Sequence, residues 1–157
     1  MVDAVGTTKY TYYAGGLLNT EDGPFASDTV TYTYNNARLR SGLTLQQPTG
    51  SWTNGFLYDA AHRLSTETSP AGTFTYTYQV RQASSLPIKL SLPNSSYITN
   101  TYDNVARLTG TYLDNSSNTV LDKSEYLYNA ADQCIRLTRT DSSYYTNTYD
   151  NIGQLID

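Results

Sequence analysis

Short segments of the chain alternate between polar and apolar residues with a period of two. Residues 28–34 alternate three threonines with a valine and two tyrosines, and residues 72–78 alternate three threonines with a phenylalanine and two tyrosines. Neighbouring side chains of an extended chain point to opposite faces, so this alternation predicts β-strands, which Thr and Tyr also favour. We expect a sheet with an aromatic face and a threonine-rich face.

A recurring phrase follows these strand-like segments. In its full form it reads Tyr-x-Tyr-Asp-x-x-Gly-Arg-Leu, and it is clearest in residues 57–64, 102–108 and 149–155. Successive copies are 20 to 26 residues apart, and self-similarity at such a period is typical of a repeat architecture. The second tyrosines of the seven copies are Tyr12, Tyr34, Tyr58, Tyr78, Tyr102, Tyr128 and Tyr149.

We therefore predict a single array over residues 1–157 rather than several separate domains. In such an array each unit contacts only its neighbours, so there is no internal domain boundary. The predicted units are residues 10–31, 32–55, 56–75, 76–99, 100–125 and 126–146, followed by a partial unit at 147–157.

Each phrase predicts a tight turn between two strands. An Asp or Asn side chain can accept a hydrogen bond from the backbone N–H about two residues later, and a glycine further along supplies a positive φ. The Arg-Leu that follows begins the return strand, as at Arg63 and Arg107. The predicted fold class is all-β: an antiparallel sheet of consecutive β-hairpins that forms a curved or spiralling strip.

The glycine position of the phrase is not always occupied by glycine. Gly16 and Gly153 fit the expected positive φ directly, while His62 and Asp132 are residue types enriched at positive φ. Ala106 is less suitable, and a left-handed backbone there should cost about 1 kcal/mol.

Two copies depart from the phrase in length. The second, in residues 34–39, is one residue short, and we expect its turn to differ from the others. The fourth loses the phrase after Tyr78, and its apolar continuation in residues 86–93, bracketed by prolines, predicts a strand.

Composition narrows the possible functions. The chain has 157 residues, a formal charge of −4 and 15% charged residues, which argues against the basic surface of a nucleic-acid-binding protein. It has no apolar stretch long enough for a transmembrane helix, and its first residues lack the pattern of a signal peptide. Sixteen tyrosines against three phenylalanines and one tryptophan indicate a partly wet aromatic face, because each phenol needs water or a partner.

The seven phrases together resemble the YD repeat of the Rhs family, over the chain from Tyr10 to Leu155. The same repeat builds the shells of bacterial insecticidal toxin complexes and the extracellular region of teneurins. The resemblance implies a strip of hairpins that, in full-length members, spirals into a hollow shell around a toxin polypeptide. It also implies a secreted or cell-surface location, with further YD repeats or a cargo polypeptide as partners.

Family members that release a C-terminal toxin carry an Asp-Pro-containing self-cleavage segment at the end of the shell. This sequence contains no Asp-Pro, so we expect neither that segment nor a toxin within it. The resemblance therefore indicates an internal slice of a longer array or a short member of the family.

The recurring acids are the first candidates for chemistry. Asp59, Asp103 and Asp150 occupy the same position of the phrase, where a set of carboxylates could act as acids and bases. Other copies have Asn35 or Asn129 there, and a turn tolerates that exchange whereas a paired-carboxylate site does not. We expect these residues to close turns.

His62 and Cys134 are the only residues of their types. A histidine-based metal site or a serine-type triad would depend on His62 alone, and its place in a repeat turn favours a structural role. Cys134 has no partner for an internal disulfide and no histidine close in sequence, which indicates an incidental thiol. We expect no catalytic residue, cofactor or metal site, and no enzyme activity.

Rows of tyrosine side chains leave two functions open. Cross-strand tyrosine ladders would stabilise the sheet by about 0.2 to 1 kcal/mol for each pair, whereas stacked rings with polar tips would bind glycans. We favour the ladders, and hence a structural segment of a shell that encloses or presents a toxin or mediates a cell-surface interaction; the alternative is a carbohydrate-binding surface. The sheet edges also predict self-association. The residues expected to hold the repeat together are Tyr12, Tyr34, Tyr58, Asp59, Arg63, Tyr78, Tyr102, Asp103, Arg107, Tyr128, Tyr149, Asp150 and Gly153.

Overall fold

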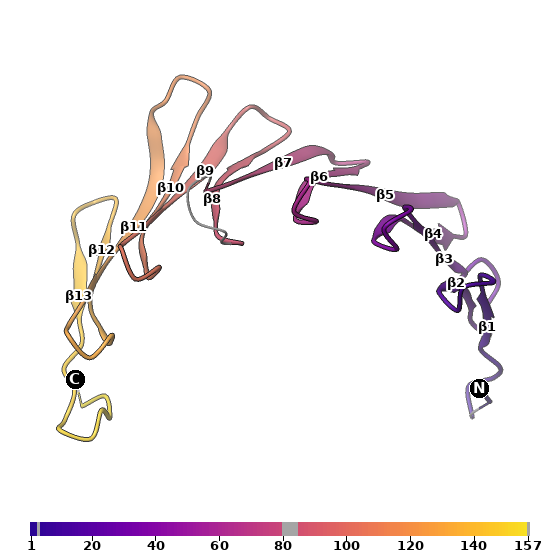
Figure 1. Ribbon diagram of the computed structural model, residues 1–157, viewed down its shortest axis with the longest axis horizontal. Helices are drawn as coiled ribbons and strands as arrows, with labels where there is room; N and C mark the ends of the chain where they lie inside the picture. Colours follow the sequence, from indigo (N-terminus) through magenta and orange to yellow (C-terminus); the bar gives the residue numbers. More distant parts are fainter. Residues whose placement is uncertain (3, 80–84, 157) are drawn as a thin grey trace. The chain divides into compact units, whose positions relative to one another are not determined.

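The computed structural model describes residues 1–2, 4–79 and 85–156. Within these residues the chain forms β-strands and turns and contains no helix (Figure 1). The strands lie in one antiparallel sheet in the order of the sequence, from β1 to β13, which confirms the predicted all-β fold of consecutive hairpins. Their bounds are β1 Lys9–Tyr12, β2 Leu18–Asp22, β3 Val30–Tyr34, β4 Arg40–Gln47, β5 Gly50–Tyr58, β6 Leu64–Ser69, β7 Gly72–Tyr78, β8 Pro87–Ser91, β9 Tyr97–Tyr102, β10 Leu108–Asp114, β11 Val120–Tyr128, β12 Cys134–Arg139 and β13 Tyr144–Thr146.

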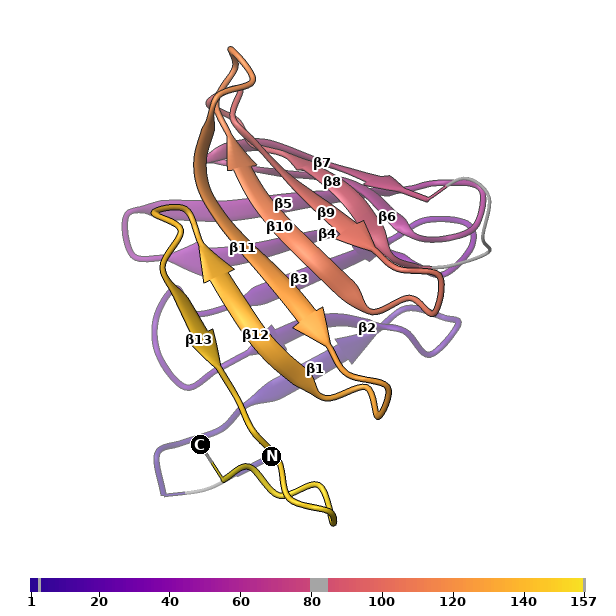
Figure 2. The same ribbon diagram turned by 90° about the vertical axis from the view of Figure 1, so that its left-hand side faces the viewer.

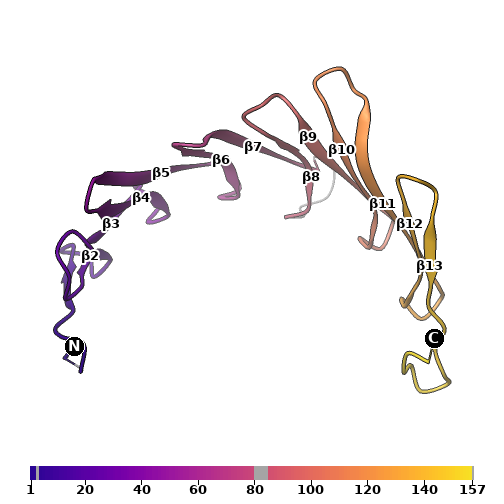
Figure 3. The same ribbon diagram turned by 180° about the vertical axis from the view of Figure 1, so that it is seen from behind.

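The chain divides into two compact units, Met1–Thr75 and Tyr76–Asp157. In the first unit, β2 to β5 follow one another as neighbouring strands (Figure 3). In the second, β9 to β12 lie side by side and are joined by turns at alternate ends (Figure 2). The finer division into seven repeat units stays a prediction.

In the first unit the pairing register gives the two faces of the sheet different characters. Tyr32 lies opposite Leu43, so the apolar side chains of adjacent strands share one face. We call this the aromatic face of the first unit; it carries Val30, Tyr32, Leu43, Leu45, Trp52 and Phe56.

The opposite face of the first unit is lined by threonine. One threonine from each of β1 to β5 lies opposite the next, in a row formed by Thr11, Thr20, Thr31, Thr44 and Thr53. Hydroxyl groups bond across the row, with 2.6 Å between the Oγ1 atoms of Thr11 and Thr20 and 3.1 Å between those of Thr44 and Thr53. These bonds supplement the backbone ladder, which suits a face that is exposed to water.

In the second unit an apolar row also lies on one face. Leu113 lies opposite Ile98, and Leu137 lies between Tyr126 and Tyr145 on the neighbouring strands. The other face is mixed rather than threonine-lined: Tyr112 lies opposite Lys123 and next to Glu125 across the sheet.

Neither face of the sheet is covered by a second layer within its unit. Among the residues that the structure describes, no hydrophobic side chain is buried, and the buried polar side chains are Ser96 and Asp114. Trp52 is 42% exposed and Leu57 is 63% exposed. Most domains bury a shared core between two packed layers, so this fold must draw its stability from contacts within a single layer.

A β-bulge accompanies the turn in five of the phrases. In the hairpin of β5 and β6, Leu57 pairs with Thr66 but Tyr58 pairs with Leu64, which leaves Ser65 as the extra residue. A bulge bends its strand and increases its local twist. The same shift occurs next to Tyr12, Tyr34, Tyr58, Tyr102 and Tyr128.

The expected difference in the second turn is wrong. Tyr34 pairs with Arg40 just as Tyr58 pairs with Leu64, and the two turns have the same length. Arg38, with φ of 63°, takes the position that His62, with φ of 61°, has in the third turn. Arg38 stands at the glycine position of the phrase and not at its arginine position, so this turn lacks no residue.

The fourth turn differs from the others. Gln79 N–H donates a 3.4 Å hydrogen bond to the carbonyl of Leu86, and the strand predicted in residues 86–93 is β8, Pro87–Ser91. Residues 80–84, which belong to the fourth predicted unit, lie outside the described residues. Over the described ranges, the chain has no helix that could cross a membrane.

Candidate functional site

In five of the phrases an aspartate or asparagine side chain closes the turn. Asp59 Oδ1 accepts hydrogen bonds from the backbone N–H groups of Ala61 and Arg63 at 2.9 and 3.0 Å. Asp59 Oδ2 accepts a further bond from Arg63 Nε at 2.7 Å. These hydrogen bonds from Arg63 hold the pKa of the Asp59 carboxyl below its usual range. Both oxygens of this carboxylate therefore serve the turn.

Aspartate and asparagine are interchangeable here because one oxygen makes both backbone bonds. In every such turn, Oδ1 of the acid or amide accepts the N–H groups two and four residues later. The residues that do so, besides Asp59, are Asn35, Asp103, Asn129 and Asp150.

The left-handed position of these turns is occupied as the phrase requires. Positive φ angles are found at His62 (61°), Ala106 (69°) and Asp132 (62°), and at Gly16 and Gly153. The His62 side chain is exposed at this position. His62 therefore serves the turn through its left-handed backbone conformation.

Arginine side chains connect consecutive turns. Arg107 Nε lies 2.6 Å from Asp103 Oδ2 of its own turn, and its Nη1 lies 2.6 Å from Asp132 Oδ1 of the next turn. The guanidinium also stacks over the ring of Tyr128, 5.0 Å from its centroid. In the first unit Arg38 makes a similar connection, donating a 2.9 Å bond to the carbonyl of Gly15.

The phrase tyrosines connect neighbouring strands through their hydroxyl groups. Tyr58 donates a 2.8 Å hydrogen bond to the carbonyl of Arg40, the first residue of β4. Three further tyrosines bond the first residue of the preceding even-numbered strand in the same way. The pairs are Tyr102 with Pro87, Tyr128 with Leu108 and Tyr149 with Cys134, at 2.8 to 3.0 Å.

Tyr12 and Tyr34 do not follow this rule. Neither hydroxyl group bonds to a residue that the structure describes; Tyr12 is 62% exposed, and the ring of Tyr34 instead meets the ring of Tyr13 edge to face, with 6.1 Å between centroids. Near these two residues, the hydroxyl of Tyr13 donates a 3.1 Å hydrogen bond to the carbonyl of Tyr32.

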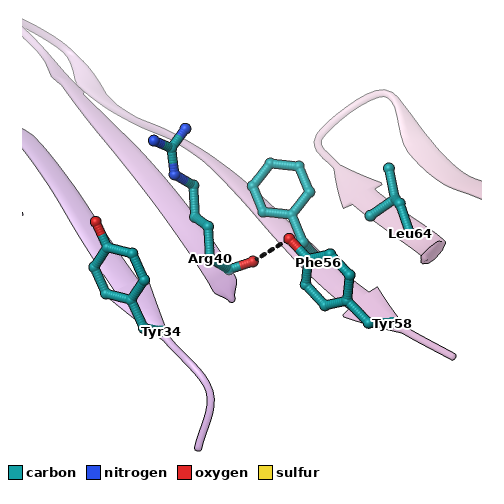
Figure 4. Close-up of a pocket in the computed structure, with 5 residues that line it drawn as sticks. All are labelled: Tyr34, Arg40, Phe56, Tyr58 and Leu64. Atoms are coloured by element: carbon teal, nitrogen blue, oxygen red, sulfur yellow. Dashed lines mark hydrogen bonds between the residues drawn. The ribbon is translucent and has the colours of Figure 1, made fainter. Parts of the chain in front are cut away.

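Two adjacent hollows lie along the turn edge of the first unit. The larger, which we call the Tyr58 hollow, measures about 420 Å³. Figure 4 shows its lining residues Tyr34, Arg40, Phe56, Tyr58 and Leu64. The smaller, the Tyr13 hollow, measures about 250 Å³ and is lined by Tyr13, Leu17, Thr33, Tyr34 and Asn35. Tyr34 separates the two and lines both.

Arg40 supplies a positive charge at the Tyr58 hollow. Its side chain is exposed, and its guanidinium stacks over the ring of Tyr32, 4.8 Å from the centroid. No carboxylate of the described residues pairs with it. The hollow therefore combines apolar walls with a guanidinium that forms no ion pair with the described residues.

Cys134 lies at the start of β12 and is half-buried. Its thiol lies 3.6 Å from the carbonyl of Arg136, and its own carbonyl accepts hydrogen bonds from Asn147 and Tyr149. Within residues 1–2, 4–79 and 85–156 the structure brings no three His, Cys, Asp or Glu side chains together as metal ligands.

Sequence reasoning missed the turn between β10 and β11 and both hollows. The Asn115 side chain closes a turn between β10 and β11 by accepting the N–H groups of Ser117 and Thr119, with φ of 60° at Asn118. The pair of asparagines three residues apart is a usable signal for this turn. The hollows have no comparable signal, because they depend on strand register and on the bulge beside Tyr34.

No family model matches the chain, and no curated protein sequence matches it. Its fold is similar to that of TcdB2-TccC3 in a crystal structure (14% identity, TM-score 0.54) and to that of TcdB2-TccC3 without its hypervariable C-terminal region (14% identity, TM-score 0.54). It is also similar to the crystal structure of TcdB2-TccC3-Cdc42 (14% identity, TM-score 0.53). Each match covers 96% of this chain and 10% of the other, so the similarity concerns the fold, and the chain spans about a tenth of the length of the chains it matches.

Proposed function

We propose that the chain is a wall segment of an Rhs/YD-type shell that encloses or presents a polypeptide. The observation that carries this proposal is the single-layer sheet: the described residues bury no hydrophobic side chain, although one face is aromatic. A layer with one largely apolar face and one largely polar face is suited to separate two environments, one of which is shielded from bulk water.

Sequence and fold support this proposal independently. The repeated Tyr-Asp phrases resemble those of shells that surround toxin polypeptides, and TcdB2-TccC3 has a similar fold at 14% identity. On this proposal the partners are further YD repeats and a cargo polypeptide, and the setting is secreted or at the cell surface.

The contacts of the repeat are those that a wall requires. A single layer cannot be held by a core, so each hairpin must be joined to the next by other means. The bond from Tyr58 to the Arg40 carbonyl and the link from Arg107 to Asp132 do this. Because the recurring polar side chains are used in such contacts, we propose that the segment is not an enzyme.

A carbohydrate-binding surface has less support. Sugar recognition needs the polar tips of aromatic residues as well as their rings, but the hydroxyls of Tyr58, Tyr102, Tyr128 and Tyr149 already donate to backbone carbonyls. Saturable binding on a glycan array, lost on replacement of Tyr76 by alanine, would restore that alternative.

Accessibility labelling of the full-length protein that contains this segment tests the shell. Leu43 and Thr44 are neighbours in β4 on opposite faces, so each can be replaced by cysteine after Cys134→Ser. A small maleimide should label both positions, whereas a maleimide with a long polyethylene glycol chain should label only the position on the threonine face. Equal labelling of both by the large reagent would show that the aromatic face is open and would contradict enclosure.

A further inference from the structure

The distance between the two hollows of the first unit is set by the repeat of the hairpins. The Tyr58 hollow lies between Tyr34 and Tyr58, the Tyr13 hollow lies between Tyr13 and Tyr34, and Tyr34 lines both. Tyr34 ends β3 and Tyr58 ends β5, so equivalent points are two strands apart. With about 4.7 to 4.9 Å between neighbouring strands, the hollows repeat every 9.4 to 9.8 Å, roughly, along the turn edge.

This spacing selects one conformation of polypeptide. A polyproline II helix has three residues per turn and rises about 3.1 Å per residue, so it presents one side chain to the same side about every 9.3 Å. An extended β-strand presents side chains to one side about every 6.6 Å, which does not match. Polyproline II segments also bind to aromatic-lined grooves in other proteins, and both hollows are lined by tyrosine.

Hydrogen bonding and charge point to the same ligand. The backbone of a polyproline II helix makes no internal hydrogen bonds, so its carbonyls need external donors. The hydroxyl of Tyr34 bonds to no described residue, and Tyr34 lines both hollows, so this hydroxyl is available as such a donor. Arg40 has no carboxylate partner among the described residues and would pair with an acidic side chain of the ligand.

We infer that the turn edge of the first unit binds a polypeptide in the polyproline II conformation, with an apolar side chain at every third position and an acidic residue beside Arg40. The inference deepens the proposed function and rests on it for the identity of the partner, which would be the enclosed polypeptide. Two successive apolar side chains occupy the Tyr13 and Tyr58 hollows, and the Tyr34 hydroxyl bonds to the carbonyl between them.

Calorimetric titration of the chain with synthetic peptides tests this inference. The probe is a peptide of four Leu-Pro-Glu repeats. One control peptide has the same composition, with its four leucines at every second position along seven consecutive residues. A second control replaces each glutamate by lysine. We expect saturable binding of the probe and affinity at least about fivefold weaker for each control.

Two variants of the chain extend the test. Arg40→Glu should reverse the charge preference and favour the lysine peptide, since the Arg40 side chain is exposed and its carbonyl contact with Tyr58 remains. Tyr34→Ala should weaken the binding of both the glutamate and the lysine peptide. Tyr144→Ala is the control: it removes a 57% exposed tyrosine outside the hollows and should leave peptide binding unchanged.

The outcomes separate this inference from the shell. Equal affinity for the two leucine spacings, or an unchanged charge preference in Arg40→Glu, would overturn the polyproline II site even if Tyr34→Ala failed to fold. The face-selective labelling described above does not depend on peptide affinity, so it would still decide whether the shell proposal stands.

Discussion

The hydroxyl of Tyr128 donates a 2.8 Å hydrogen bond to the carbonyl of Leu108, the first residue of β10. Burial raises the pKa of the Tyr128 hydroxyl, with smaller contributions from neighbouring groups. The bond joins the turn end of the β11–β12 hairpin to the turn end of the β9–β10 hairpin. In a sheet without a buried core, such side-chain bonds to the backbone carry stability that packing supplies elsewhere.

Tyr128→Phe should therefore lower the free energy of unfolding by about 0.5 to 1.5 kcal/mol, since it removes this bond and leaves the Leu108 carbonyl without its donor. Urea denaturation followed by circular dichroism measures the change. Tyr126→Phe is the matched control, because the Tyr126 hydroxyl bonds to no described residue. Equal losses in the two variants would show that the hydroxyl of Tyr128 contributes nothing specific.

Acid should destabilise the fold through the turn carboxylates. Hydrogen bonds from Arg63 lower the pKa of Asp59. Burial would raise the pKa of Asp103, but hydrogen bonds from Arg107 outweigh it, so the net direction is also downward. A folded-state pKa below the unfolded value of about 3.9 means that the stabilisation is present above about pH 4 and is lost as the pH falls through the folded value.

Denaturation curves at neutral pH and at about pH 3 measure this loss. The double variant with Asp59→Asn and Asp103→Asn keeps the Oδ1 acceptors but has no charge to lose, so its stability should fall less on acidification. Asn129→Ala is the control: it removes two turn bonds without changing a titratable group, and should lower stability equally at both pH values. An unchanged acid dependence in the double variant would contradict this account.

Much of the fold was predictable because the turn chemistry is local. The Asp59 turn needs only an oxygen at one position and a tolerated positive φ three residues later, and both are visible in the phrase. The faces follow from strict alternation, as in residues 28–34. The predicted difference of the second turn is wrong because Arg38 occupies the position where the phrase has glycine. The spacing of this copy agrees with the other copies, but the residue type at this position does not.

The hollows could not be predicted because they are not local. Arg40, Phe56 and Leu64 come from three strands, and their meeting depends on pairing register and on a bulge that leaves Ser65 unpaired. The phrase indicates that a hairpin forms, but it does not determine the register between that hairpin and the neighbouring strands. The site therefore emerges from the array rather than from any one copy of the phrase.

Gly110 allows a close approach that no larger residue would. A Cβ atom there would lie 2.7 Å from the Tyr112 ring and 2.8 Å from Thr101 Oγ1. Gly110→Ala should displace the ring, break the 3.0 Å bond from the Tyr112 hydroxyl to Glu125, and lower the free energy of unfolding by about 1 to 3 kcal/mol.

Spectroscopic titration gives a second measurement for this variant. Burial, and next Glu125, raise the pKa of Tyr112, so a displaced ring should titrate closer to the ordinary value of about 10. In a Tyr112→Ala background the same glycine substitution should be neutral or stabilising, because the main obstacle is gone and Gly is itself unfavourable within a strand. A loss of similar size in both backgrounds would assign the strain to the backbone instead.

Glycine should stabilise the protein at Ala106. Its φ of 69° is strained for any residue with a Cβ atom, so Ala106→Gly should raise the free energy of unfolding by about 1 kcal/mol. Ala131 stands one position before the positive φ of Asp132 and is itself not left-handed, so Ala131→Gly should instead lower stability by adding freedom to the unfolded chain. Urea midpoints of the two variants measure this opposition. Changes of the same sign would mean that turn strain is not what limits stability at Ala106.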